Sequence, residues 1–186
     1  MKKDLGSEGE LFPQSVFIVV SYGEDGTPNA MNAAWAGECG DKEICLNIGN
    51  HKSTANIVAR RAFTVAPADV AHVVEADYFG IATGNKVDKA AASGMTFVKS
   101  EHVDAPVIEE FPLTMECEVT DVRGDEHGAR IVGRVVNTRV DESILDDEGR
   151  VDFAKMRPII YDSTRRVYRV VGEEVGGAWN AGKKLL

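Results

Sequence analysis

Short apolar runs alternate with glycine-rich turns in the first quarter of the chain. Residues 16–22 are β-branched and aromatic, which predicts a buried strand, and the glycines within 23–26 mark a turn after it. Residues 27–37 and 43–48 form two further runs of strand character. Three strands joined by short loops predict an antiparallel meander.

Three short helices are predicted in the middle of the chain, at residues 55–61, 68–79 and 86–93. Either Ser53 or Thr54 can cap the first helix, because a hydroxyl oxygen accepts a hydrogen bond from the free N–H groups of the first turn. Gly94 closes the third helix, at the position where glycine commonly ends one. Between the first two helices, residues 63–66 predict a short strand.

The second half of the chain returns to strands. Residues 113–120 alternate between polar and apolar side chains, and residues 129–137 are predicted to be their hairpin partner. Residues 158–161 and 166–171 are the last strand candidates. The segment 101–126 is strongly acidic, and we expect it to form solvated strand faces and turns.

Six or seven short strands, with two or three short helices between them, indicate a mainly β antiparallel barrel or sandwich. A parallel α/β fold would need strands and longer helices that alternate throughout, and the second half lacks this alternation. The 186 residues contain no repeat and no linker. We therefore expect one domain over residues 1–186, with a flexible N-terminus at residues 1–12.

The charge balance excludes two classes of partner. The chain carries 21 Lys and Arg against 30 Asp and Glu, a net charge of −9. Binding to nucleic acid or to an anionic membrane needs clustered Lys and Arg, so we expect neither partner. A small anionic ligand needs only a few local donors and stays possible. The N-terminus lacks the apolar core of a signal peptide, and no run is long enough to span a membrane, so we expect a cytoplasmic protein.

The residues that most often carry catalysis do not cluster. The three cysteines, Cys39, Cys45 and Cys117, contain no Cys-x-x-Cys pair, which favours reduced thiols. Cys117 alternates with Met115 and Val119, as a core residue would. The four histidines have no metal-binding spacing, and no nucleophile elbow or nucleotide-binding glycine motif is present. No metal site and no catalytic side chain are predicted.

Residues 50–56 are the most informative stretch. They place Lys52, Ser53 and Thr54 at the start of a predicted helix, where unpaired N–H groups and the helix dipole attract anions. This pattern predicts a phosphate site. The alternative is an ordinary capped helix with a solvated lysine.

Two further stretches suggest a flat ligand. In residues 29–35, alanines alternate with asparagines up to Trp35, so a planar ring can approach the strand and meet polar groups along its edge. The alternative is a bulged strand with a core Trp. In residues 83–89, Gly84 permits close approach, and Lys86 and Lys89 supply positive charge; the alternative is an exposed polar loop.

Together and in this order, these stretches resemble the flavin reductase-like FMN-binding split-barrel family, which includes flavoredoxin. The similarity covers about residues 16–184. Its matching motifs are the strand at 16–22, the turn at 26–29, the runs 29–37, 52–57 and 63–65, the groups 77–80, 83–84 and 88–89, the strand 112–119 and the tail glycines Gly172, Gly177 and Gly182.

The resemblance implies a six-stranded antiparallel Greek-key split barrel and a homodimer with non-covalent FMN near the subunit interface. It implies that Lys52, Ser53 and Thr54 bind the phosphate. It places along the isoalloxazine Asn29, Met31, Asn32, Ala33, Ala34 and Trp35. It places near the cofactor as well Asn47, Ile48, Asn56, Thr83, Gly84 and Lys89.

The resemblance also implies an oxidoreductase of the flavin reductase type, which passes hydride or electrons from NAD(P)H through FMN to a flavin, a ferric complex or a protein. A missing catalytic constellation agrees with this, because a flavin carries the chemistry itself. One alternative is a non-catalytic FMN electron carrier, like flavoredoxin, that a protein partner reduces. Another is a flavin-storage protein or a barrel that has lost its cofactor.

Overall fold

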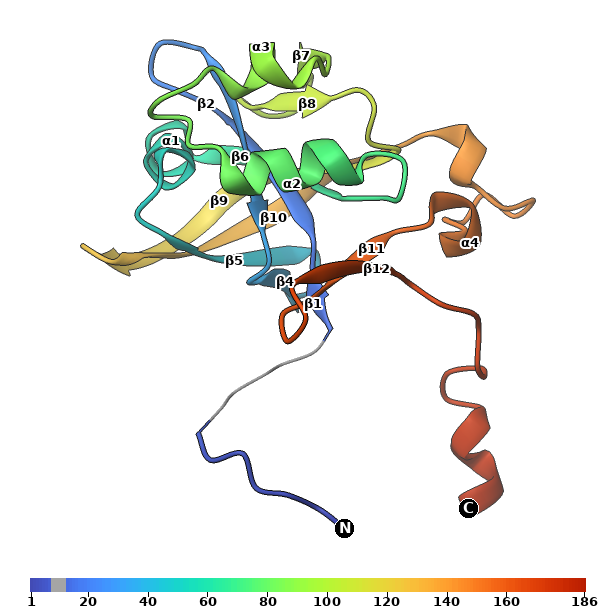
Figure 1. Cartoon of the computed structure of the whole chain (residues 1–186). Helices are drawn as coiled ribbons and strands as arrows, with labels where there is room; N and C mark the ends of the chain where they lie inside the picture. Colours follow the sequence, from blue (N-terminus) through green and yellow to red (C-terminus); the bar gives the residue numbers. More distant parts are fainter. Residues whose placement is uncertain (8–12) are drawn as a thin grey trace.

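An antiparallel seven-stranded sheet forms the body of the protein in the computed structural model, which describes residues 1–7 and 13–186 (Figure 1). The predicted flexible N-terminus at residues 1–12 lies partly outside these described residues. The strands follow one another across the sheet in the order β3 (Pro28–Ala33), β2 (Phe17–Tyr22), β6 (Ala62–Pro67), β9 (Leu113–Asp125), β10 (Gly128–Val140), β5 (Glu43–Gly49) and β4 (Ala36–Gly40).

The two edge strands of this sheet, β3 and β4, are consecutive in the chain. The run 27–37, expected as one strand, is therefore bent at Ala34 and Trp35, and its halves pair with β2 and with β5. Counted as one bent strand, β3 and β4 give a six-stranded barrel, which confirms the predicted fold class. The Ser15 hydroxyl lies 3.1 Å from the carbonyl oxygen of Ala34 and 2.9 Å from that of Ala36, and donates to this bend.

The predicted hairpin of the second half is confirmed and is longer than expected, because β9 and β10 run for 13 residues each. A small sheet adds β1 (Gln14–Ser15), β11 (Ile159–Asp162) and β12 (Val167–Val170). A hairpin that the sequence did not predict consists of β7 (Phe97–Lys99) and β8 (Pro106–Ile108).

Short helices connect the strands: α1 (Lys52–Arg60), α2 (Val73–Ile81), α3 (Lys89–Ser93) and α4 (Phe153–Met156), with 3-10 turns η1 (Glu142–Ile144) and η2 (Ala181–Leu185). The expected start of the first helix is wrong, because α1 begins at Lys52 and Thr54 stands inside its first turn. Gly94 closes α3 with φ +70°, as predicted. No helix of the described residues has the length and apolar character to cross a membrane.

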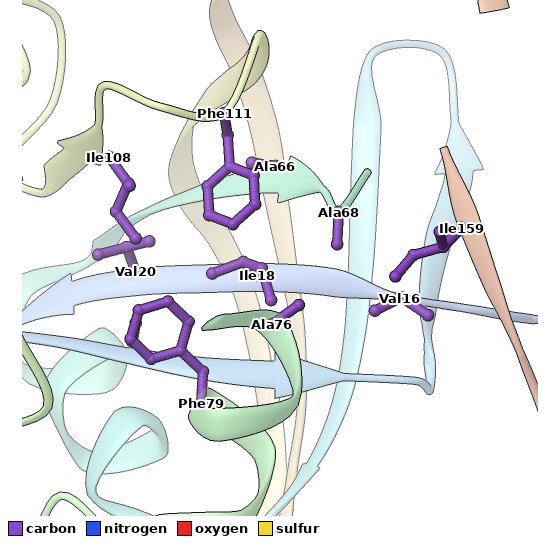
Figure 2. Packing of buried hydrophobic residues seen from close by; sticks show 11 residues of the cluster. Val16, Ile18, Val20, Ala66, Ala68, Ala76, Phe79, Ile108, Phe111 and Ile159 are labelled. Carbon is purple, nitrogen blue, oxygen red and sulfur yellow. The ribbon is translucent and has the colours of Figure 1, made fainter. Parts of the chain in front are cut away.

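The core lies on both sides of β2. Its outward side chains join a cluster with Ala76 and Phe79 of α2, as Figure 2 shows, while Val19 points into the barrel. This double burial explains why residues 16–20 are apolar throughout, since a strand covered on both faces shows no alternation. Helix α2 is thereby held across the outside of the barrel, over β3 and β2 (Figure 1).

The acidic segment 101–126 differs from its prediction. Seven of its residues are buried apolar side chains: Val103, Ala105, Val107, Ile108, Phe111, Cys117 and Val119. Glu116 is also buried, and its carboxylate accepts hydrogen bonds from Ser100 Oγ and Asn137 Nδ2. The expectation was based on the many acidic residues of this segment. It did not take into account the apolar residues between them, whose side chains are buried.

Candidate functional site

Side chains near the start of α1 organise its N-terminus. His51 is the N-cap residue, and its backbone N–H donates to Thr54 Oγ1 at 3.4 Å. The Thr54 hydroxyl in turn donates to the carbonyl oxygen of Gly49 at 2.6 Å. Thr54 therefore serves the helix start. The other N–H groups of the first turn have no partner within the helix, which makes this end attractive to anions.

Three segments far apart in the sequence meet at this helix end. Asn29 of β3 donates through Nδ2 to Ser53 Oγ at 2.7 Å, and both residues are buried. Lys52 donates through Nζ to the carbonyl oxygen of Gly84 at 3.2 Å, in the loop after α2. These two hydrogen bonds join the three stretches that the sequence singled out.

A first hollow of about 390 Å³ lies between these segments, within the usual range for small-molecule sites. It is lined by most of the residues predicted for binding: Asn29, Met31, Asn32, Lys52, Ser53, Thr83, Gly84 and Lys89. Lys52, Ser53 and Asn29 supply hydrogen-bond donors on one wall. This hollow suits an anionic group carried by a larger molecule.

Gly84 allows the loop after α2 to lie close against the floor of the first hollow. A Cβ atom at this position would collide with Asn29 Oδ1 and would lie 3.2 Å from Lys52 Cδ. Glycine is therefore required here by space, since its φ lies outside the left-handed range. The loop carbonyl can then reach the Lys52 ammonium.

Lys89 is a buried cation in the wall of the first hollow. Its Nζ donates to the carbonyl oxygens of Ala30 and Phe79, both at 2.8 Å. No ion pair among the described residues includes Lys89, and burial lowers the pKa of its ammonium. Lys89, at the start of α3, thereby ties α2 to β3, although it lies 59 residues from Ala30 in the sequence.

Two more hollows continue from the first. The second, of about 710 Å³, is lined by Ala34, Trp35 and Asn47 among others. Trp35 is 68% exposed, so the alternative of a core Trp is wrong. The third, of about 370 Å³, lies under the β11–β12 hairpin and is lined by Tyr161 and Tyr168 among others.

Shared residues join the three hollows into one strip. The first and third hollows share Asn32, Gly80 and Ile81. The third and second share Ser15 and Ala34. The strip therefore runs from the start of α1, along the edge strand β3, to the bend at Trp35. Such a shape fits an elongated ligand with an anionic end and a flat end.

Four predicted site residues do not line this strip. The side chains of Ala33 and Ile48 pack in the barrel core, and the Thr54 hydroxyl serves the helix start. Asn56 is buried, and its Nδ2 donates to Ser21 Oγ at 3.4 Å. That these four residues contact a ligand stays a prediction, and any such contact would be made by their backbone atoms.

The sequence pointed to Asn32 and Ala34 of the third hollow, but not to Tyr168 or to its contact with Asp77. There, Tyr168 Oη donates to Asp77 Oδ1 at 2.8 Å, and burial together with Asp77 raises the pKa of Tyr168. The two residues lie 91 positions apart, on β12 and α2. A tyrosine within a predicted strand does not indicate this contact, because the contact depends on where the β11–β12 hairpin packs.

Comparisons with known proteins agree with this geometry. Residues 9–169 match the family described as "Flavin reductase like domain". Flavoredoxin of Desulfovibrio vulgaris (Miyazaki F) has 38% sequence identity and a TM-score of 0.92, with 98% of this chain and 100% of that chain covered. Flavoredoxin from Methanosarcina acetivorans has 25% identity and a TM-score of 0.91, with 100% of both chains covered. The uncharacterized protein YdfE of Bacillus subtilis (strain 168) is 29% identical over 94% of this chain and 91% of its own length.

Proposed function

Because this chain belongs to the flavin reductase-like family, we propose that it is an FMN-binding oxidoreductase that takes hydride from NAD(P)H and passes electrons to an acceptor. The family binds FMN. The observation that carries the proposal for this chain is the strip of three joined hollows, with donors at one end and an exposed Trp35 at the other. The acceptor would be a flavin, a ferric complex or a protein.

The residues at the start of α1 fit the phosphate of FMN. Lys52 supplies a positive charge, and Ser53 and the first-turn N–H groups supply donors. Asn29 holds the Ser53 side chain in place through its 2.7 Å hydrogen bond. The close packing at Gly84 brings the loop carbonyl to Lys52 and so fixes the direction of its ammonium.

The other end of the strip fits a planar ring. Ala34 leaves the strand surface open, and Asn32 can offer its side-chain oxygen because its Nδ2 already donates to the carbonyl of Ala76 at 3.0 Å. Trp35 can cover one ring face. When bound, FMN supplies the redox chemistry, since its ring accepts a hydride and can release the electrons. The side chains bind and orient the ring and limit its access to water.

We also propose that the protein is a homodimer whose interface lies next to the strip. Trp35 and Ile81 line the hollows and are 68% and 78% exposed. Large apolar side chains of this exposure favour contact with a second protein surface. A partner subunit would shield the ring end from water.

A second candidate function is a non-catalytic FMN electron carrier that a protein partner reduces. The similarity to a flavoredoxin at 38% identity, over nearly the whole chain, favours it. The two candidates share the same cofactor site and differ in the electron donor.

The absorbance spectrum of the purified protein tests both candidates. We expect flavin bands in the purified protein, or after addition of FMN and removal of the excess. Anaerobic NADH or NADPH should then bleach the bound flavin. A bound flavin that neither nucleotide bleaches would support the carrier. A protein without flavin bands that takes up no FMN would contradict both functions.

A further inference from the structure

Two cysteines lie on the neighbouring strands β4 and β5, and one of them lines the second hollow. Cys45 stands in β5 between Ile44 and Leu46, which point into the core, so its own side chain points outward. Cys39 stands in β4, at a bulge where the register with β5 shifts between Glu38 and Gly40. Both are free thiols in this structure.

The two thiols are neighbours and differ in exposure. Cys45 pairs with Gly37, two residues before Cys39 on β4, and Cys39 is near enough to contribute to the raised pKa of Cys45. Cys39 is exposed, whereas Cys45 is 6% exposed and lines the second hollow together with Arg130. Burial raises the pKa of Cys45, and the positive charge of Arg130 acts in the opposite direction. An accessible thiol with a second thiol nearby is the arrangement of a redox pair.

We propose that Cys39 and Cys45 form a thiol–disulfide exchange site, in which the exposed Cys39 reacts with a small disulfide and Cys45 then closes an intramolecular bridge. This site is independent of a bound flavin. The positive charge of Arg130 partly offsets the burial that disfavours the Cys45 thiolate, which the second step requires.

The exchange balances without a further reagent. The Cys39 thiolate attacks one sulfur of the small disulfide, forms a mixed disulfide and releases one thiolate. The Cys45 thiolate then attacks the Cys39 sulfur, which forms the Cys39–Cys45 bond and releases the second thiolate. The small disulfide thus takes up two electrons and two protons and leaves as two thiols.

The strand that carries Cys39 can adjust to the bridge. Among the described strands, β4 pairs with β5 alone, so it can shift at its bulge without disturbing a second ladder. A disulfide needs its Cα atoms about 4.4–6.8 Å apart. The bridge would tie β4 to β5 in the wall that also holds Trp35.

Incubation of the full-length protein with oxidised glutathione, without oxygen, tests the site. We expect intact-mass spectra to show the loss of two hydrogen atoms. Trypsin cleavage at Lys42, which lies between the two cysteines, should yield two peptides that only the disulfide holds together. Dithiothreitol should separate them.

Variants assign the steps. Cys45→Ser should stop at one glutathione bound to Cys39, and Cys39→Ser should not react. Cys117→Ala should form the bridge like the wild type, because Cys117 is fully buried in the core, where burial and Glu116 raise its pKa to about 12. A wild-type protein that keeps a stable glutathione adduct, forms a disulfide between two chains or does not react would overturn the proposal. The wild-type peptide map decides this without any variant.

Discussion

Single side chains at the start of α1 decide how the first hollow is built. Ser53 is held by Asn29, Lys52 is aimed at the Gly84 carbonyl, and Thr54 is used by the helix itself. The sequence singled out these three residues as a group, because hydroxyls and a lysine at the start of a helix form a recognisable pattern. The sequence could not show which of the three side chains face the hollow and which one serves the helix, because this depends on contacts with β3 and with the loop after α2.

Replacement of Lys52 and Ser53 together, as Lys52→Ala with Ser53→Ala, tests the phosphate end. A hydrogen bond to a charged group contributes about 1.5–3 kcal/mol, so we expect FMN affinity to fall by roughly one order of magnitude or more. Quenching of flavin fluorescence on titration measures this affinity. Riboflavin, which lacks the phosphate, serves as the control ligand, and its affinity should not change. An equal loss for both flavins would contradict a phosphate role.

Gly84→Ala tests the close approach of the loop. The new Cβ would collide with Asn29 Oδ1, so either the loop or Asn29 must move. Overpacking of this kind costs about 1–3 kcal/mol, and we expect weaker FMN binding together with a lower free energy of unfolding. Gly172→Ala is the matched control, because its Cβ would meet no atom within 4 Å. If FMN binds equally well to both variants, the loop does not need this contact.

Among the elements, long amphipathic ones were predictable and short ones were not. The hairpin of β9 and β10 follows from alternation over many residues, whereas β7, with three residues, is too short to show a period. The local sequence pattern also does not predict the bend that divides β3 from β4. It arises because the two halves pair with strands on opposite sides of the closing barrel, and the Ser15 hydroxyl binds the carbonyls at the bend.

The β11–β12 hairpin, which covers the third hollow, should lose stability in acid through Asp162. This carboxylate accepts hydrogen bonds from Thr164 Oγ1 and from Arg169 Nε, and these contacts hold its pKa at about 2. Because the folded pKa lies below the unfolded value of about 3.9, the stabilisation is present above the unfolded pKa and is lost as the pH falls toward 2.

Urea unfolding of the wild type and of Asp162→Asn between pH 2 and about 6 measures this effect. We expect the wild type to be more stable near pH 6 and the difference to shrink as the pH falls. Asp125→Asn is the comparison variant, since Asp125 is an exposed residue at the end of β9 and accepts a hydrogen bond from the His127 backbone N–H. A difference between wild type and Asp162→Asn that does not vary with pH would show that Asp162 acts through packing alone.

At the scale of the whole molecule, apolar surface extends beyond the strip. After β12 the chain leaves the barrel and ends in η2, away from the body (Figure 1). Val175 and Trp179 in this segment are 95% and 96% exposed. A chain segment with so little contact to its own barrel would gain stability from the second subunit of the proposed homodimer. The net charge and composition gave no sign of this surface, because exposure is a property of the folded chain.

Sedimentation equilibrium tests this expectation. The wild type should sediment at twice the mass of one chain, and Trp179→Ser should shift the equilibrium toward the monomer, since burial of an aromatic side chain is worth about 1.5–3 kcal/mol. Circular dichroism should remain that of the wild type, because Trp179 packs on nothing in its own barrel that would support the fold. A wild type that sediments as a monomer would contradict the homodimer.

The bend between β3 and β4 has a consequence for motion. A continuous barrel strand moves only if hydrogen-bonded ladders break on both of its sides, but here each half of the bent strand belongs to a single ladder. The barrel thus has a seam along the same edge where the three hollows join. A ligand that fills the strip would contact both β3 and β4 and hold them together. The amide hydrogens of β4 should therefore exchange with deuterium more slowly when FMN is bound. The fraction of protein with bound FMN would then determine how often the barrel opens between β3 and β4.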